Sequence, residues 1–294
     1  HWSLAAIARS NPGKRPALFH PEGDTTETLE IPTDEDEMIR AIEKLRKAVE
    51  RARPKKGRLR GFLTLALLTA GVSAAIFLLP NAVVDQAIKV VPDVKRAEIG
   101  NALLTQMQRA TGKPCSSPSA NPALVALTRR MTLGEEPTYL AVMRAGVKEA
   151  IHIPGGVILL SRTMVEDYES PDVLAGYIIA EQVRRETRDP LRHLLESAGL
   201  VATLRLLTTS RMPESAIEDH AKQLLTEKRA PLPTPALLAR FETLEIPSST
   251  YGYAVDVTGE LTLPLIEGDP LAGATQEPVL PDSAWVRLQA ICEG

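Results

Sequence analysis

The fold is decided by the stretch GFLTLALLTAGVSAAIFLLPNAVV at residues 61–84, which contains no charged side chain. An α-helix rises about 1.5 Å per residue, so roughly 20 such residues cross the ~30 Å hydrocarbon core of a bilayer. A soluble helix of this length would normally carry a polar face, and a secretory signal sequence would stand at the N-terminus. The sequence therefore predicts one transmembrane helix, from about Phe62 to Leu79.

The charges on either side of this helix predict its orientation. Asp85, Lys89 and Asp93 follow it, whereas the residues just before it are strongly basic. The basic residues are Arg51, Arg53, Lys55, Lys56, Arg58 and Arg60. Because basic flanks stay on the cytoplasmic side of a bilayer, the N-terminus is expected in the cytoplasm. We divide the chain into a cytoplasmic segment at 1–57, a transmembrane helix at 58–84 and an outer domain at 85–294.

Composition argues against some function classes. The 294 residues are 44% hydrophobic and 24% charged, which is typical of globular protein, and the net charge is -3 with a pI near 6.0. No global basic surface is therefore available to neutralise phosphates, so we expect no nucleic-acid partner. The sequence also has no glycine-rich phosphate loop of the kind that nucleotide chemistry needs.

The cytoplasmic segment predicts a small local fold. Met38, Ile42, Leu45 and Val49 recur at helical spacing after an acidic start, which predicts an amphipathic helix from about Asp36 to Arg51. Short strands can form at Leu18-Phe19 and at Leu29-Glu30-Ile31 in the same segment. This helix is expected to cover the strands or to dock a partner.

The outer domain alternates helix and strand patterns and predicts an α+β fold. Helical periodicity occupies 97–110 and 122–131, and strand candidates lie at 139–143, 150–153 and 157–160. Pro154-Gly155-Gly156 turns the last two strands into a hairpin. Ser170 is a good helix N-cap, with Pro171 at the first helical position. Glu181 then falls in the middle of an apolar helix behind the hairpin.

This order of elements, with an acidic loop and a helix opening Leu174-Ala175, resembles the HtpX-like, CAAX-prenyl-protease and BepA-type family of membrane-linked zinc metallopeptidases. The resemblance covers about Ile99 to Pro247, and the tail from Asp282 to Cys292 has the pattern of a terminal helix with Trp285, Leu288 and Ile291 as its apolar face. It implies a mainly helical zincin-like domain with a small β-sheet, in the periplasm, on a protein that spans the bacterial inner membrane once.

Family members bind zinc through a His-Glu-x-x-His box, in which two histidines one helical turn apart hold the ion and the glutamate acts as general base. The alignment puts Ala180 at the first histidine, Glu181 at the glutamate and Arg184 at the second histidine. Alanine has no lone pair and a guanidinium stays protonated, so neither ligates zinc. The resemblance therefore implies a vestigial Glu181 and no bound zinc.

The family's third ligand is a glutamate in a Glu-x-x-x-Asp motif, which Glu214 to Glu218 matches with glutamate in place of the aspartate. We expect Arg184 to point its charge into the vacated metal position and to pair with Glu214, Glu181 or both. The alternative is an ordinary surface ion pair between Glu181 and Arg184 on an unrelated helix.

The remaining reactive residues give weaker indications. His152, His193 and His220 stand singly rather than at ligand spacing, although His152 and the Pro154-Gly155-Gly156 turn can line a substrate groove beside the edge strand that the family uses. Ser116 and Ser117 have no placed base and are expected in a loop. The only two cysteines, Cys115 and Cys292, can form a disulfide in an oxidising compartment or remain as unpaired buried thiols.

Two function classes follow. In the first, the protein is a membrane-anchored pseudo-peptidase that binds a polypeptide or a membrane complex as an adaptor, assembly factor or accessory subunit. In the second, it is an active zinc metalloendopeptidase of envelope protein quality control whose ligands are not aligned, such as His193 or His220 with Glu214. A purely structural membrane subunit is a third possibility.

Overall fold

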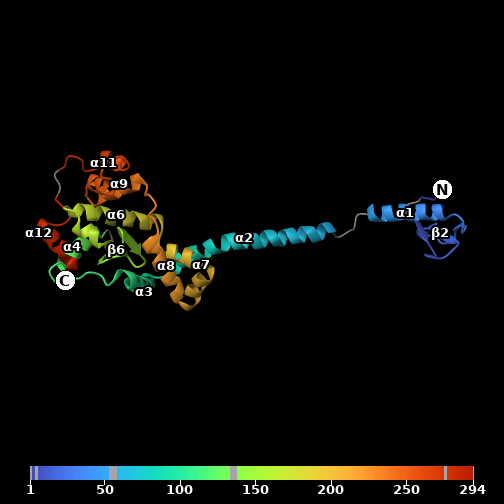
Figure 1. Ribbon diagram of the computed structural model, residues 1–294, viewed down its shortest axis with the longest axis horizontal. Coiled ribbons are helices and arrows are strands. Elements are labelled where there is room, and N and C mark those ends of the chain that lie inside the picture. The colour runs from blue at the N-terminus through green and yellow to red at the C-terminus, as the bar shows by residue number, and fades with distance from the viewer. Residues whose placement is uncertain (1, 4–5, 53–57, 133–137, 275–276, 294) are drawn as a thin grey trace. The chain divides into compact units, whose positions relative to one another are not determined.

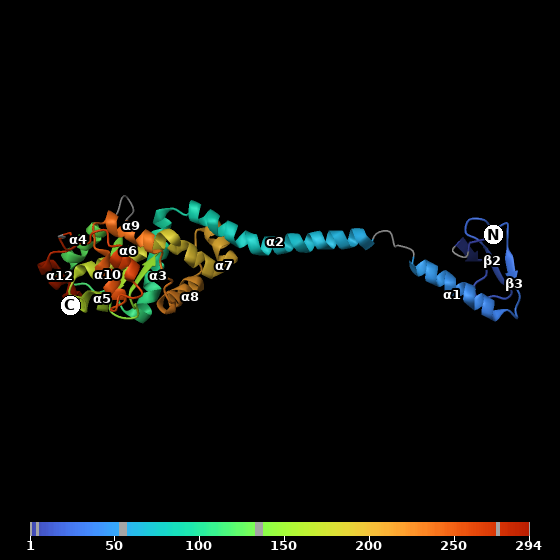
Figure 2. The same ribbon diagram turned by 90° about the horizontal axis from the view of Figure 1, so that it is seen from above.

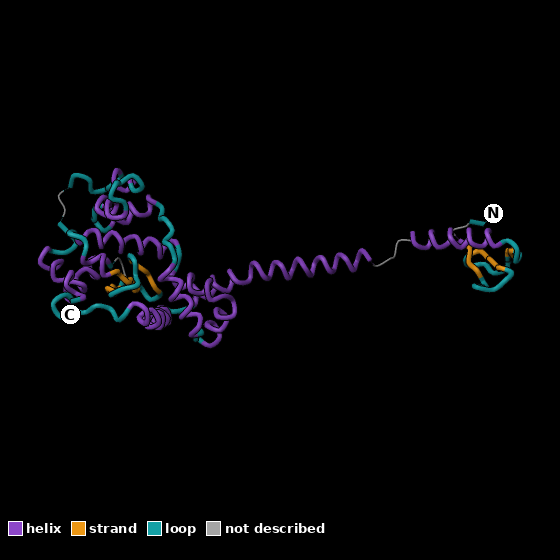
Figure 3. The backbone as a smooth tube through the Cα atoms, in the orientation of Figure 1, coloured by secondary structure: helices purple, strands orange, loops and turns teal. Residues whose placement is uncertain are grey.

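The computed structural model describes residues 2–3, 6–52, 58–132, 138–274 and 277–293. The chain forms two compact units, His1–Ser73 and Ala74–Gly294, and one long helix crosses the boundary between them (Figure 1). Each unit has a small sheet and at least one helix, so the predicted α+β class is confirmed (Figure 3).

The first unit is a three-stranded antiparallel sheet with one helix on it. In chain order its elements are β1 (Ile7–Arg9), β2 (Ala17–Pro21), β3 (Leu29–Ile31) and α1 (Asp36–Ala52). Phe19, Ile31 and Ile39 are buried together and form its core. The predicted helix and both predicted strands are confirmed. Sequence analysis missed β1, whose sequence Ile-Ala-Arg has a single large apolar residue, whereas the equally short β3 has two.

Helix α2 (Arg58–Val90) contains the predicted transmembrane segment. Its stretch Phe62–Val90 is long and apolar enough to cross a bilayer, and its most apolar window is 0% buried in the structure. Phe77, for example, is 76% exposed, which is unfavourable in water and suits a lipid environment. The helix continues past the predicted end at Leu79. Three of the residues that predict the orientation, Arg53, Lys55 and Lys56, lie outside the described residues.

The second unit surrounds one small sheet with helices. The sheet order is β4-β6-β5, with β4 parallel and β5 antiparallel to β6, so the predicted hairpin is confirmed and β5 is an edge strand. The elements are α3 (Asp93–Thr111), α4 (Asn121–Met131), β4 (Tyr139–Met143), β5 (Ala150–Ile153), β6 (Val157–Ser161), α5 (Arg162–Glu166), α6 (Pro171–Thr187), α7 (Pro190–Thr209), α8 (Glu214–Thr226), α9 (Thr234–Thr243), α10 (Ser248–Val255), α11 (Leu263–Glu267) and α12 (Asp282–Gln289).

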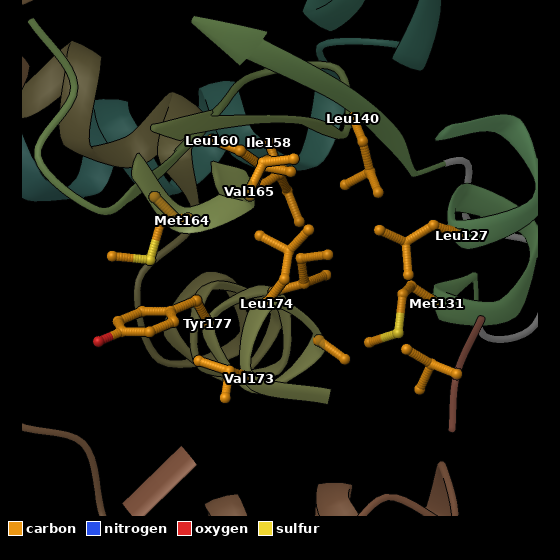
Figure 4. Packing of buried hydrophobic residues seen from close by; sticks show 14 of the residues in the cluster. Leu127, Met131, Leu140, Ile158, Leu160, Met164, Val165, Val173, Leu174 and Tyr177 are labelled. Atoms are coloured by element: carbon orange, nitrogen blue, oxygen red, sulfur yellow. The ribbon is translucent and has the colours of Figure 1, made fainter. Parts of the chain in front are cut away.

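Helix α6 is the centre of the main core. It is buried without interruption from Val173 to Val183, which explains why its sequence lacks a polar face. Leu174 lies against side chains of β6 and α5, such as Leu160 and Val165 (Figure 4). On another side α6 meets α10, where a Cβ added at Gly176 would fall 2.5 Å from the Cβ of Tyr251. The glycine therefore allows the two helices to approach closely.

The C-terminal end of the chain is tied back to the start of the domain. Cys115 and Cys292 form a disulfide, which is the first of the two states that sequence analysis left open. Trp285, Leu288 and Ile291 are buried, as the predicted apolar face requires. Helix α12 packs on α4 and α5, and the three residues belong to the main core cluster. The tail is therefore part of the core.

Candidate functional site

Helix α6 holds Glu181 inside the protein. Ser170 caps the helix by accepting a hydrogen bond from the Asp172 N–H, and Pro171 begins it, as predicted. Three turns later Glu181 faces the interior and is only 3% exposed. A buried carboxylate requires partners, because removing it from water without them costs several kcal/mol.

Both carboxylate oxygens of Glu181 are occupied. Oε2 accepts the backbone N–H of His152 on β5 at 3.0 Å, and Oε1 accepts Nε of Arg184 at 3.0 Å. Arg184 Nη1 also donates to the carbonyl oxygen of Ala230 at 2.7 Å. The carboxylate therefore links α6 to the edge strand on one side and to a cation on the other.

This arrangement differs from a surface ion pair. Arg184 is three residues after Glu181, but the side chains are 22% and 5% exposed, so the pair is mostly shielded from water. The imidazole of His152 is also buried, with Nδ1 at 3.3 Å from the Glu181 carbonyl, and burial lowers the pKa of His152. A neutral His152 leaves Arg184 as the cation that balances Glu181.

The other expected site residues lie elsewhere. Glu214 opens α8, where Oε1 accepts a hydrogen bond from Gln106 Nε2 of α3 at 3.3 Å. Glu218 is exposed and its Oε1 pairs with Lys222 Nζ at 2.8 Å. Within the described ranges, Arg184 forms an ion pair with Glu181 and not with Glu214. Of the alternatives that sequence analysis left open for Arg184, the structure shows the pair with Glu181.

These residues do not fit a zinc ion. Ala180, which the resemblance aligns with the first zinc ligand, is buried and offers no donor atom, and Arg184, which it aligns with the second, presents a guanidinium. Among the residues that the structure describes, no group of three His, Cys, Asp or Glu side chains is placed to hold a metal. We derive no chemistry through a metal at this position.

β5 is an edge strand of the sheet next to this cluster, and its four residues are buried. The Ser161 N–H bonds to the Glu149 carbonyl, which sets the register and turns the backbone of Ala150 and His152 away from β6. The Glu181 carboxylate accepts a hydrogen bond from the His152 N–H, whereas we find no partner for the Ala150 N–H among the described residues. Ala150 lines a cavity of about 250 Å³ whose other walls include Lys148, Leu224 and Leu225. Unpaired strand edges accept extended peptides.

The Pro154-Gly155-Gly156 turn lies against α3. A Cβ added at Gly100 would fall 1.9 Å from the Pro154 carbonyl oxygen, and one added at Gly155 would fall 2.6 Å from the Ala97 Cα. Gly155 and Gly156 have φ values of 85° and 77°, which favour glycine. The turn therefore fixes the hairpin on the helix, while the cavity lies by the opposite end of β5.

Sequence analysis missed a histidine pair. His193 of α7 and His220 of α8 lie edge to face, with ring centroids 4.8 Å apart. His193 Nε2 lies 3.2 Å from Glu227 Oε2, and His220 Nδ1 lies 2.9 Å from Ser197 Oγ. Burial lowers the pKa of both rings, that of His220 to about 4. No spacing rule brings two residues on different helices together, so the sequence did not indicate this contact.

Tyr251 is a further residue that the sequence did not indicate. It packs edge to face on Tyr177 of α6, with centroids 5.1 Å apart, and burial raises the pKa of Tyr251 to about 12. Its phenol therefore stays neutral near Glu181 and Arg184.

Comparisons of this chain with protein-family models and with curated proteins found no match.

Proposed function

We propose that this chain is a membrane-anchored pseudo-peptidase that binds extended polypeptide. In this proposal it descends from the zinc metallopeptidases that its sequence resembles, has lost their metal ligands, and acts as an adaptor, assembly factor or accessory subunit of a membrane complex. The proposal rests mainly on one observation. Both oxygens of Glu181, at the family's general-base position, are engaged by the His152 N–H and by Arg184.

A general base must be able to accept a proton from a water molecule placed beside the substrate. The Glu181 carboxylate instead accepts hydrogen bonds from a backbone amide and a permanently charged guanidinium, each at 3.0 Å. Each donor takes one lone-pair direction of the carboxylate, and the 3% exposure of Glu181 leaves little room for a water molecule beside it. This bonding supports a structural role for Glu181 in place of catalysis.

Polypeptide binding is supported by the edge of β5. An extended peptide added there would pair with the outward backbone groups of Ala150 and place a side chain in the adjoining cavity of about 250 Å³. Leu224 and Leu225 give that cavity apolar walls, and Lys148 and Arg229 lie at it as well. The backbone contacts would be independent of peptide sequence, which suits an adaptor that binds varied chains.

Membrane anchoring is supported by α2, whose apolar stretch Phe62–Val90 is long enough to cross a bilayer. We propose a single pass through a bacterial inner membrane, with the N-terminus in the cytoplasm and the second unit in the periplasm. The Cys115–Cys292 disulfide suits that oxidising compartment.

The first test is peptide binding by the full chain in lipid nanodiscs, with fluorescein-labelled, reduced and carboxymethylated α-lactalbumin as the probe. Ala150→Pro removes the outward N–H and leaves the β5–β6 ladder its donors, whereas Ala150→Val adds similar bulk and keeps the N–H. We expect anisotropy binding in the parent and in Ala150→Val, and a loss in Ala150→Pro. Equal binding by all three proteins would exclude the β5 edge.

A second candidate, an active metalloendopeptidase, is favoured by the contact between His193 and His220. Elemental mass spectrometry of the full chain, prepared without chelator and dialysed against trace zinc, separates the two candidates. The pseudo-peptidase predicts a zinc content near zero. About one zinc per chain, lost in His193→Ala, would establish a metal site at the histidine pair and overturn the proposal.

A further inference from the structure

The last turns of α2 pack against α7, and their contacts define how the two helices run. Arg192 Nη2 of α7 pairs with Asp85 Oδ1 at 2.5 Å. Arg96 donates to Asp189 Oδ2 and to the Ile88 carbonyl, each at 2.7 Å. Residue 189 therefore lies near residue 88 and residue 192 near residue 85. Helix α7 begins antiparallel to α2, beside which both views place it (Figures 1 and 2).

Helix α7 turns back at Gly199. This residue has φ 81° and ψ 176°, which breaks the helix into two halves. Leu194 of the first half and Leu206 of the second lie in one buried cluster with Val84 and Ala87 of α2. Since residues on both sides of the break return to the same cluster, residues 197–204 form the tip of a helical hairpin. We call this segment the α7 tip.

The α7 tip reaches the level of the exposed apolar part of α2. From the Arg192–Asp85 pair, Gly199 lies seven residues along α7 and Leu78 seven residues back along α2, which is about 10 Å of helix rise in each case. Leu78 is 68% exposed, within the stretch that we propose to cross the bilayer. The tip is therefore placed where the lipid–water interface would lie.

The composition of the α7 tip suits that place. Val201 is 81% exposed and Leu204, three residues on and on the same helix face, is 43% exposed. On its inner side Val201 borders a cavity of about 330 Å³ between α7 and α8, so the core does not need this side chain. Glu196 pairs with Arg188 and Arg192, which offsets its charge. The exposed Arg205 has a long side chain that can reach lipid phosphates.

We propose that the α7 tip inserts Val201 and Leu204 into the interface of a phospholipid bilayer, next to α2. This inference rests on the proposed membrane anchor and adds a second contact with the same bilayer. An apolar tip beside a spanning helix would hold the second unit at a fixed tilt to the membrane surface. The edge strand β5, in the same unit, would then keep one orientation toward polypeptides near the membrane.

The test introduces one cysteine at a time into the full chain and labels it with a fluorophore. The native Cys115 and Cys292 form a disulfide, so only the introduced thiol reacts with the label. Val201→Cys carries an environment-sensitive NBD fluorophore at the α7 tip. Val257→Cys, on the loop after α10, is the matched control, since Val257 is 86% exposed in the same unit. Ala70→Cys, in the apolar stretch of α2, reports the anchor itself. Each protein is reconstituted in phosphatidylcholine and phosphatidylglycerol vesicles, with or without doxyl-labelled lipid, whose label is shallow for positions 201 and 257 and deep for position 70.

We expect a blue-shifted emission at position 201 that the doxyl lipid quenches, and neither effect at position 257. Quenching at position 70 without quenching at position 201 would overturn the α7 tip and leave the anchor intact. No quenching at position 70 would show that the anchor itself is wrong, and the tip with it. Equal quenching at 201 and 257 would also refute the inference, because the contact would then not be specific to the tip.

Discussion

Arg184→Ala is the substitution that tests the Glu181 cluster most directly. In the intact protein the Arg184 side chain has two contacts, with Glu181 Oε1 at 3.0 Å and with the Ala230 carbonyl at 2.7 Å. Truncation removes both contacts and leaves one oxygen of a buried carboxylate without its donor. The His152 N–H still bonds the other oxygen, so the carboxylate loses its countercharge and keeps half of its hydrogen bonds.

The size of the effect follows from burial. Breaking a fully buried ion pair by removing one partner costs roughly 3–5 kcal/mol. Arg184 is 22% exposed, so water can enter its place and reduce that cost, while the lost bond to Ala230 adds about 1 kcal/mol. We expect a loss of about 3 kcal/mol in the free energy of unfolding.

Urea denaturation of the full chain in detergent micelles measures this loss. The protein has two tryptophans, and Trp2→Phe leaves the buried Trp285 as the only fluorescent reporter, in the core of the second unit. With a urea m-value of about 2 kcal/mol per molar, the midpoint should fall by about 1.5 M.

Arg162→Ala is the control for this measurement. It removes an ion pair between Arg162 Nε and Glu166 Oε2 at 2.6 Å, whose side chains are 44% and 25% exposed. A surface pair at this spacing contributes less than about 0.5 kcal/mol. Equal midpoints for Arg184→Ala and Arg162→Ala would refute the claim that Glu181 depends on a cation at position 184.

Three further predictions concern the second unit. Replacing Cys115 and Cys292 by serine opens a loop of 177 residues, and chain entropy predicts a loss of about 5 kcal/mol in urea denaturation. Burial lowers the pKa of His220 from 6.5 to about 4, so as the pH falls the unfolded chain binds a proton that the folded protein does not. The free energy of unfolding should therefore decrease by about 3 kcal/mol when the pH is lowered from 6.5 to 4. His220→Gln should remove this contribution to the pH dependence. Gly100→Ala places a methyl group against the Pro154 carbonyl oxygen and should cost more than about 2 kcal/mol, whereas Gly71→Ala, with nothing within 4 Å, should not lower the midpoint.

Local sequence patterns predicted most of the elements that they specify directly. The strands at 139–143 and 150–153 begin and end as expected, and Ser170 and Pro171 begin α6, because capping and alternation depend on neighbours in the chain. The uncharged stretch at 61–84 predicted the long helix for the same reason. The helix extends to Val90 because its last turns find a tertiary partner in α7, which periodicity does not report.

The site was predictable only where one helix supplies both partners. Glu181 and Arg184 are one turn apart, so their pairing follows from helix geometry. The bond from the His152 N–H and the contact between His193 and His220 join different elements, and no local rule specifies them. Glu214 shows the same limit. Its partner Gln106 lies on a different helix, and only tertiary packing brings the two side chains together.

The bonding of Glu181 changes what its presence in the sequence implies. A glutamate that a resemblance aligns with a general base suggests catalysis as long as its partners are unknown. Here the carboxylate accepts the outward His152 N–H of an edge strand and pairs with the guanidinium of Arg184. Arg184 places a positive charge beside the carboxylate, so the buried glutamate needs no metal ion to balance its charge. Structural need alone therefore explains why Glu181 is present, and retention of this residue carries no argument for peptidase activity.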